Sequence, residues 1–269
     1  MKIALYIGKE ETGGGTRVQD MLRRLEDAGM HLYRMSGLQD LLPGTDMLIS
    51  VGGDGTFLSS SMLVAQYGIP VVGVNLGRLG FLSENRPEDV AEALLTGNYS
   101  LEERAVLSAV SGGDVRNEVY ALNEITVHRS GAALLAVDVM LDGVRIPTYW
   151  ADGLIVSTSS GSTAYSLSAG GPIVLPESKV LIITPIAPHN LNVRPLVVPD
   201  SAKISIKAYS RDRQVIFTAD NRSMNMDEGV ELDISLAQFL LKRVRLYNSD
   251  FINALTEKLY WGEDLRNNK

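Results

Sequence analysis

The pattern of apolar segments changes near Asn98, and this change limits the folds open to the chain. Before it, short apolar segments alternate with segments whose apolar residues recur at helical intervals. Such alternation predicts an open, mostly parallel α/β sheet. After it, many short apolar stretches are separated by turn signals, which predicts a β-rich second domain.

The expected elements follow from local patterns. Thr16 and Gln19 have the spacing of a capping box and open a helix that ends at Gly29. Further helices are expected at 57–67 and 87–97, and a last one at 250–259. Asp142-Gly143 is a strong hairpin signal. Strands are expected at 2–7, 31–35, 46–51, 70–74, 105–110, 119–127, 134–141, 154–156, 180–183, 203–209, 214–218, 230–234 and 242–246.

Composition excludes several classes of protein. The 269 residues contain no cysteine, so disulfide scaffolds, zinc-thiolate sites and thiol nucleophiles are ruled out. The net charge of −7 argues against a nucleic-acid partner, because phosphate backbones need clustered Lys and Arg. The charge-free stretches 55–77 and 153–176 are interrupted by polar residues, Gly and Pro, which argues against membrane spans. We expect a cytoplasmic protein with no membrane partner.

A glycine-rich motif follows the apolar segment 46–51. Gly52-Gly53-Asp54-Gly55-Thr56 joins a predicted strand to a predicted helix, the position at which open α/β sheets bind ligands. Its glycines favour close approach of backbone N–H groups to a phosphate. A carboxylate there repels phosphate unless it serves as a general base or a metal ligand. The alternative is a tight turn in which Asp54 caps the helix.

Two further polar segments are candidates for binding. Residues 152–172 run from Asp152 through a strand into a Ser/Thr/Gly loop and a short helix, which suits sugar hydroxyls or phosphates. A serine-rich capped turn is the alternative. Asn123-Glu124 lies within an apolar stretch and is uninformative by itself. The three histidines are interpreted as structural. Walker, G-x-G-x-x-G and G-x-S-x-G motifs are absent, which disfavours P-loop enzymes, dinucleotide oxidoreductases and serine hydrolases.

Taken together, these segments resemble the NAD kinase family. Besides the motif at Asp54, the resemblance is carried by Asn123-Glu124, the segment 152–158 and the run Thr163-Ala164-Tyr165-Ser166-Leu167-Ser168-Ala169-Gly170-Gly171. Leu79-Gly80-Phe81-Leu82, Leu101-Glu102-Glu103-Arg104, Pro188-His189 and Arg194-Pro195-Leu196 also match. The motif at Asp54 also resembles lipid kinases and phosphofructokinases, whereas the long run is specific to the family.

The resemblance implies a fold and an activity. The fold is an N-terminal Rossmann or phosphofructokinase-like α/β domain over 1–99 and a β-sandwich-like, NAD-binding domain over 100–246. A C-terminal helix within 247–269 packs back on the first domain. The activity transfers the γ-phosphoryl of ATP, or a phosphoryl of polyphosphate, to the 2′-hydroxyl of the adenosine ribose of NAD, which gives NADP. A homodimer or homotetramer is expected.

The resemblance also assigns residues. Asp54 would accept the hydroxyl proton, hold Mg²⁺ with the ATP phosphates, or do both. The residues expected to bind substrates are Gly52, Gly53, Gly55, Thr56, Phe81, Asn123, Glu124, Asp152, Ser160, Thr163, Ala164, Tyr165, Ser168 and Ala187.

The sequence departs from the family at two places. The loop 158–162 lacks the usual proline, and Asp220-Asn221-Arg222 stands where the family often has Asp-Gly-Gln. We assign no ligand contact to the second segment, where an arginine can instead meet a phosphate. Two alternatives stay open: a lipid or sphingoid-base kinase, and a dinucleotide sensor without catalysis. Donor preference, acceptance of NADH and feedback by the product are also open.

Overall fold

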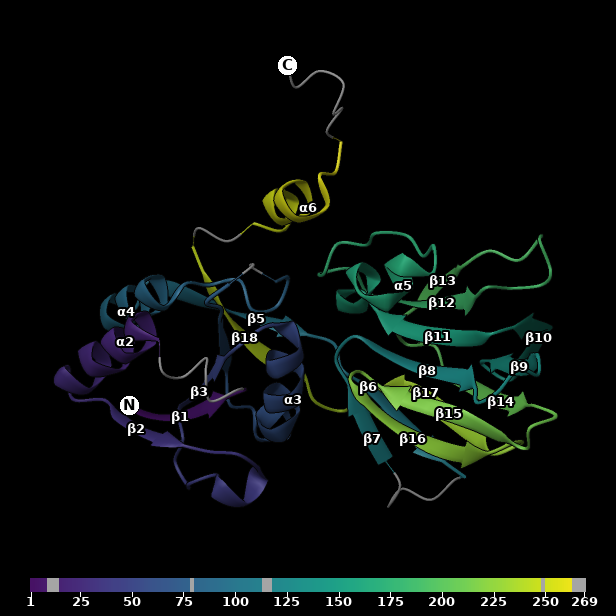
Figure 1. The fold of residues 1–269 in the computed structure, drawn as a ribbon, viewed down its shortest axis with the longest axis horizontal. Coiled ribbons are helices and arrows are strands. Elements are labelled where there is room, and N and C mark those ends of the chain that lie inside the picture. Colours follow the sequence, from purple (N-terminus) through teal and green to yellow (C-terminus); the bar gives the residue numbers. More distant parts are fainter. Residues whose placement is uncertain (9–14, 78–79, 113–117, 248–249, 263–269) are drawn as a thin grey trace. The chain divides into compact units, whose positions relative to one another are not determined.

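The computed structural model describes residues 1–8, 15–77, 80–112, 118–247 and 250–262. The chain forms two compact units, one of Met1–Glu103 with Leu241–Lys269 and one of Arg104–Leu240 (Figure 1). Parts of two sequence expectations fall outside the described residues: Leu79 of a family motif, and 248–249 and 263–269 of the C-terminal region.

The first unit is built on a six-stranded sheet whose order is β2–β1–β3–β4–β18–β5. The pairs β1/β2, β1/β3, β3/β4 and β4/β18 are parallel, which confirms the open α/β sheet. The strands are β1 (Lys2–Ile7), β2 (His31–Arg34), β3 (Met47–Val51), β4 (Val71–Val74), β5 (Tyr99–Arg104) and β18 (Leu241–Leu246). Every residue of β3 and β4 is buried, as expected for central parallel strands.

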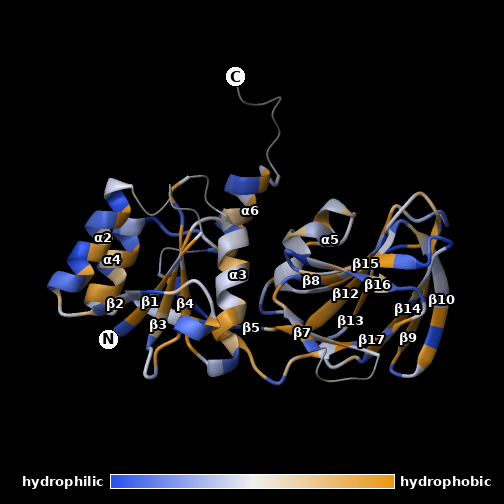
Figure 2. Cartoon of the chain, turned by 60° about the horizontal axis from the view of Figure 1, so that its bottom comes forward, coloured by the Kyte–Doolittle hydropathy of each residue, from blue (hydrophilic) through white to orange (hydrophobic). Residues whose placement is uncertain are grey.

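Helix α2 (Thr16–Asp27) of this unit buries one apolar stripe. Its buried residues are Val18, Met21 and Leu25, at the predicted helical spacing. The predicted capping box is wrong, because Gly15 is the N-cap and no side chain caps the helix. The other helical segments are η1 (Leu38–Asp40), α3 (Asp54–Val64), η2 (Ala65–Tyr67), α4 (Pro87–Thr96) and α6 (Phe251–Leu259). Figure 2 shows the hydrophilic residues along α2 and the hydrophobic strands of both units.

The predicted β-rich domain over 100–246 includes residues 100–103 and 242–246, whereas the structure places these residues in the first sheet. Val244 and Leu246 of β18 pack in the hydrophobic core of the first unit. Arg243 is buried there and forms ion pairs with Glu84 and with Glu102 of β5. These long-range contacts, rather than any local pattern, decide which sheet the two strands join.

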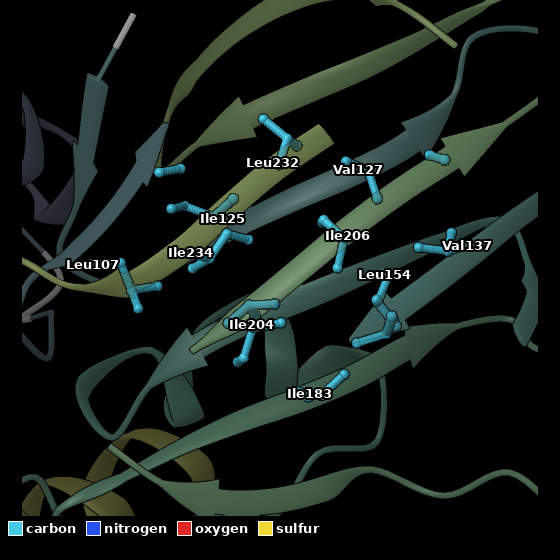
Figure 3. Close-up of a cluster of buried hydrophobic side chains, with 14 of the residues drawn as sticks. Leu107, Ile125, Val127, Val137, Leu154, Ile183, Ile204, Ile206, Leu232 and Ile234 are labelled. Atoms are coloured by element: carbon cyan, nitrogen blue, oxygen red, sulfur yellow. The ribbon is translucent and has the colours of Figure 1, made fainter. Parts of the chain in front are cut away.

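The second unit consists of two antiparallel six-stranded sheets that share one hydrophobic core, which confirms the β-sandwich-like domain. Ile125, Leu154 and Ile183 come from one sheet, and Leu107 and Val137 from the other (Figure 3). One sheet contains β10 (Val144–Ala151), β9 (Leu135–Leu141), β14 (Ile204–Tyr209), β17 (Glu231–Leu236), β6 (Leu107–Ser111) and β7 (Glu118–Ala121). The other contains β13 (Leu196–Pro199), β12 (Val180–Ile186), β11 (Gly153–Thr158), β8 (Glu124–Arg129), β15 (Gln214–Ala219) and β16 (Arg222–Asp227).

Two turns in this unit bear on the sequence predictions. The hairpin at Asp142-Gly143 is confirmed, since both residues have positive φ and Val144 pairs with Leu141. The single strand expected at 119–127 is wrong, because β7 and β8 belong to different sheets and the chain changes sheet at Leu122 and Asn123. This change of sheet places Asn123 and Glu124 at the end of β8.

The helical segment predicted near 162–170 is present as η4 (Ser160–Thr163) and α5 (Tyr165–Ser168). Strands β5, β10, β13 and β16 have no counterpart among the predicted strands. In the described part of the chain, no helix is both long and apolar enough to cross a membrane.

Candidate functional sites of the two units

The loop between β3 and α3 brings glycines to a helix N-terminus. Gly52 is buried, has a φ of +151°, and faces the Thr56 side chain so closely that a Cβ would lie 2.4 Å from Thr56 Oγ1. Gly53 and Gly55 are exposed, and a Cβ at either would meet open space. The N-terminal turn of an α-helix carries positive partial charge and suits an anion. This part of the motif can therefore accept phosphate oxygens.

Asp54 begins α3 and is bound by a distant loop. Its Oδ1 accepts hydrogen bonds from the backbone N–H groups of Leu82 (3.1 Å) and Ser83 (2.8 Å), and its Oδ2 accepts one from Phe81 (2.9 Å). A carboxylate has about four acceptor positions, so these donors leave about one for another partner. The alternative in which Asp54 caps the helix is therefore not observed, and a tertiary contact orients the carboxylate.

The loop at 80–85 is itself fixed by hydrogen bonds. Ser83 Oγ donates to the Gly52 carbonyl at 2.6 Å, and Asn75 Nδ2 donates to the Ser83 carbonyl at 3.2 Å. Asn85 Nδ2 donates to the Gly73 carbonyl at 2.9 Å. Because these buried side chains tie the loop to β4 and to the residue that follows β3, the N–H groups that hold Asp54 are preorganised. Asn75, Ser83 and Asn85 were not among the predicted site residues.

In the second unit, Asn123 and Glu124 are both 8% exposed, and Asp220 holds their backbone. The Asp220 carboxylate accepts from the N–H groups of Leu122 (2.8 Å), Asn123 (2.8 Å) and Glu124 (3.2 Å). The Asp220 N–H donates back to the Glu124 carbonyl at 2.9 Å. Asp220 has a φ of +51°, a conformation that Asp and Asn adopt more readily than most residues.

The segment Asp220-Asn221-Arg222 has no ligand contact predicted from the sequence. Asp220 supports the Asn123-Glu124 pair, and the only local signal for it was the turn between two strands. Arg222, considered as a phosphate ligand, donates instead to the backbone carbonyl of Tyr120.

The pKa values of two carboxyl groups of this site are raised. Burial, together with the negative charge of Asp220, raises the pKa of Glu124 to about 8, and the Tyr165 N–H opposes that shift. Burial also raises the pKa of Asp220, while the three N–H donors and Arg222 oppose the rise. At neutral pH Glu124 therefore carries a proton that it can donate in a hydrogen bond.

The loop after β11 contacts the same pair. Thr158 Oγ1 donates to the Leu122 carbonyl at 2.7 Å, and the Thr158 N–H donates to the Asn123 carbonyl at 2.9 Å. Gly161 lies so close that a Cβ would be 2.1 Å from the Asn123 carbonyl oxygen. Ser160, Thr163 and Ala164 are partly exposed on this loop, and Ser160 Oγ accepts from Arg104 at 3.2 Å. The Ser/Thr/Gly segment and Asn123-Glu124 thus form one local structure.

One face of the sheet links Glu124 to Tyr165. Glu124, Thr126 and His128 alternate along β8, and Glu124 pairs with Ser157. The ring of Tyr165 stacks on His128 with centroids 5.7 Å apart and an interplanar angle of 19°. His128, interpreted from the sequence as structural, therefore contacts a predicted site residue. The Tyr165 side chain is 39% exposed, and Ser168 on the next turn is also exposed.

Asp152 and Ala187 lie at the opposite end of β11 from Glu124. Gly153 pairs with Ile186 in the antiparallel pair β11/β12. Asp152, which precedes Gly153, and Ala187, which follows Ile186, therefore lie beside each other. Arg129 contacts Asp152 through two nitrogens, with Nε 3.0 Å from Oδ1 and Nη2 3.1 Å from Oδ2. Asp152 is thus paired with an arginine, and the structure does not bring it beside Asn123-Glu124.

Several buried polar atoms lack a partner. Within the residues that the structure describes, Asn123 Oδ1, Glu124 Oε2 and Ser157 Oγ are buried and have no hydrogen-bond partner. Such atoms are costly unless something else satisfies them. Because Glu124 and Ser157 are paired across β8 and β11, these atoms mark a site for a polar ligand.

No group of three or more His, Asp or Glu side chains that could hold a metal ion occurs in the described ranges. A metal at Asp54 would need most of its ligands from a substrate. Mg²⁺ is commonly bound in this way, by one or two carboxylates, water and substrate phosphates.

Comparison with known proteins finds family matches in both parts of the chain. Residues 16–99 match the ATP-NAD kinase N-terminal domain, and residues 122–246 match the ATP-NAD kinase C-terminal domain. An NAD kinase of Flavobacterium psychrophilum is 41% identical over 241 residues, which cover 87% of this chain and 82% of that protein.

Two solved structures share the fold. A yeast NADH kinase complexed with NADH superimposes with a TM-score of 0.87 at 26% identity, over 100% of this chain and 90% of that one. An NAD kinase from Archaeoglobus fulgidus in complex with ATP gives a TM-score of 0.79 at 29% identity, over 97% and 99%. On the two domain matches and the identity to its relatives, this chain belongs to the NAD kinase family.

Proposed function

We propose that the chain transfers the γ-phosphoryl of ATP to the 2′-hydroxyl of the adenosine ribose of NAD, giving NADP and ADP. The observation that carries this proposal is Asp54, a carboxylate oriented by three backbone N–H groups at the N-terminus of α3. Matches to both NAD kinase domains disfavour the lipid kinase alternative.

Asp54 acts as the general base. The ribose oxygen forms a bond to the γ-phosphorus, the bond from that phosphorus to the β–γ bridging oxygen breaks, and the hydroxyl proton passes to Asp54. Because glycines 52, 53 and 55 have no side chain, the backbone N–H groups at the start of α3 can face phosphate oxygens. Thr56 follows these glycines in the same turn. Mg²⁺, bound by Asp54 and the phosphates, would neutralise charge on the transferring group.

Asn123 and Glu124 bind the adenosine of NAD. The unpartnered Oδ1 of Asn123 is suited to an amine or hydroxyl donor of that nucleoside, and the protonated Glu124 carboxyl can donate through its unpartnered Oε2 to an acceptor of the nucleoside. Ser160, Thr163, Ala164, Tyr165 and Ser168 contact the same nucleoside. Asp152 binds a hydroxyl farther along the dinucleotide. Phe81 in the first unit and Ala187 in the second each supply an apolar contact to a substrate.

The direct test is an assay of NADP formation with purified protein, NAD, Mg²⁺ and ATP. Parallel reactions contain polyphosphate in place of ATP, NADH in place of NAD, or EDTA. Metal-dependent NADP formation supports the proposal, and the parallel reactions define the donor and acceptor. Binding of NAD without NADP formation from either donor would favour the sensor alternative. Light scattering of the same preparation tests the proposed homodimer or homotetramer.

Replacement of Gly80 by Ala tests the loop beside Asp54. A Cβ at Gly80 would lie 1.9 Å from Asp54 Oδ1, so the carboxylate has to move. We expect kcat to fall by about a hundredfold, because misplacing a reacting group by 1 Å costs roughly this much. Steady-state kinetics measures it. Gly97→Ala is the control, since Gly97 has positive φ but no neighbour within 4 Å. An equal loss in both variants would contradict the role assigned to Gly80.

Stability should depend on pH through Glu124. Its pKa of about 8 lies above the reference value of 4.5, so the folded state binds more protons than the unfolded state between these values. The free energy of unfolding therefore falls as the pH rises through this range. Glu124→Gln mimics the protonated form, and we expect it to be more stable than the parent chain at pH 8 and similar near pH 5.

Urea denaturation at both pH values measures this effect. Glu26→Gln, a change at an exposed carboxylate of α2, is the matched control and should show no such difference. A Glu124→Gln variant whose stability relative to the parent chain is the same at both pH values would refute the raised pKa.

A further inference from the structure

The C-terminal helix α6 contacts the loop that orients Asp54. Lys258 Nζ donates a hydrogen bond to the Gly80 carbonyl and lies 4.7 Å from the centroid of the Phe81 ring. The ring of Phe251, at the start of the same helix, is 6.3 Å from that of Phe81. Ala254 and Leu255 are buried, so α6 is packed rather than projecting into solvent. The helix thus presents one cation and one aromatic ring to residues 80 and 81.

These two residues also lie next to the Asp54 carboxylate. The Phe81 N–H donates to Asp54 Oδ2 at 2.9 Å, and the α-carbon of Gly80 packs against the same group. The Gly80 N–H donates to the Ser83 carbonyl at 3.0 Å, which closes the loop on itself. Hydrogen bonds from Ser83, Asn75 and Asn85 hold the later part of the loop, whereas the carbonyl of Gly80 and the ring of Phe81 are held by Lys258.

The half-buried Lys258 amine lies among groups of both charges, and its pKa is lowered overall. Burial lowers the pKa of the half-buried amine, while the carboxylates of Glu84 and Asp54 oppose that shift and the charge of Arg243 adds to it. A cation over an aromatic face is attracted by the ring quadrupole, and more strongly where water is excluded. The hydrogen bond from a charged donor to a carbonyl is also stronger than one between neutral groups.

We propose that Lys258 is a positioning residue for phosphoryl transfer: it holds Gly80 and Phe81 so that their loop presents its N–H groups to Asp54. This inference rests on the proposed function, in which Asp54 is the catalytic base. The alternative is that Lys258 only secures α6 to its unit, with no effect on the carboxylate.

The test compares three variants in the NADP assay. Lys258→Met keeps most of the side-chain length and removes the charge and the donor. We expect kcat to fall by about ten- to a hundredfold, because the base is misaligned. The KM for NAD should change less than about twofold, because the residues proposed to bind NAD are unchanged. Lys258→Arg should recover most of the activity, since a guanidinium can both donate to the carbonyl and stack on the ring. Asn253→Ala, at an exposed position of α6, is the control and should match the parent chain.

Amide hydrogen exchange of Phe81, Leu82 and Ser83 supplies a readout that needs no activity. Lys258→Met should exchange faster at these three amides while β3 stays protected, and Lys258→Arg should not. Unchanged exchange at 81–83, or equal kinetics for Lys258→Met and Asn253→Ala, would overturn the inference. A parent chain that forms no NADP would instead overturn the proposed function, and the exchange measurement would still decide whether Lys258 holds the loop.

Discussion

Replacement of Asp54 by Asn is expected to lower kcat by about a hundred- to ten-thousandfold, the range typical for loss of a general base. The amide cannot accept the proton of the attacking ribose hydroxyl, and it is a weaker ligand for Mg²⁺. NAD binding should persist, because the residues proposed to bind the adenosine belong to the second unit. Steady-state formation of NADP gives kcat, and calorimetric titration with NAD gives the affinity.

The control for this variant is a measurement of stability, which shows whether the loop that binds residue 54 is disturbed. Asn can place its carbonyl oxygen where Oδ1 accepts from Leu82 and Ser83, so only the Phe81 N–H loses its acceptor. An unsatisfied donor costs about 1–3 kcal/mol, which a urea denaturation curve detects separately from kcat. A variant with normal turnover would show that Asp54 is not the base, and would favour phosphoryl transfer directed by substrate positioning alone.

Replacement of Asp220 by Ala is the second large effect that we expect. Three backbone N–H groups lose their common acceptor, and Ala is less tolerant than Asp of the φ of +51°. We expect the free energy of unfolding to fall by about 2–5 kcal/mol, since several buried donors are left unpaired. We also expect weaker NAD binding, because Asn123 and Glu124 lose the support that orients them. Urea denaturation and NAD titration measure the two losses.

Asp220→Asn separates conformation from charge. Asn tolerates the left-handed conformation and offers one carbonyl oxygen to the N–H groups of Asn123 and Glu124, so most of the stability should return. Removing the charge beside Glu124 should also lower the pKa of that residue. If Ala and Asn at this position behaved alike, the hydrogen bonds of the Asp220 carboxylate would not be what holds the pair.

The sequence by itself determined much of the local structure and the chemical identity of the site. Val18, Met21 and Leu25 recur at helical spacing, and they are the residues that α2 buries. Asp142-Gly143 makes the predicted hairpin, because its two residues accept the positive φ that a two-residue turn needs. The glycine motif predicted the start of a helix beside a strand, although α3 begins at Asp54 and not at Phe57.

Only the tertiary structure decided how these pieces support one another. Asp54 accepts hydrogen bonds from N–H groups 27 to 29 residues later in the chain. Asp220 accepts hydrogen bonds from N–H groups 96 to 98 residues earlier. Strand β18 joins the first sheet through a parallel pairing with β4, so its partner is not its neighbour in the sequence. Helical and strand periodicity report which face of a segment is buried, but they carry no information on the partner that buries it. Backbone N–H groups are the same in every residue except proline, and so the donors that orient both carboxylates leave no signal in the sequence.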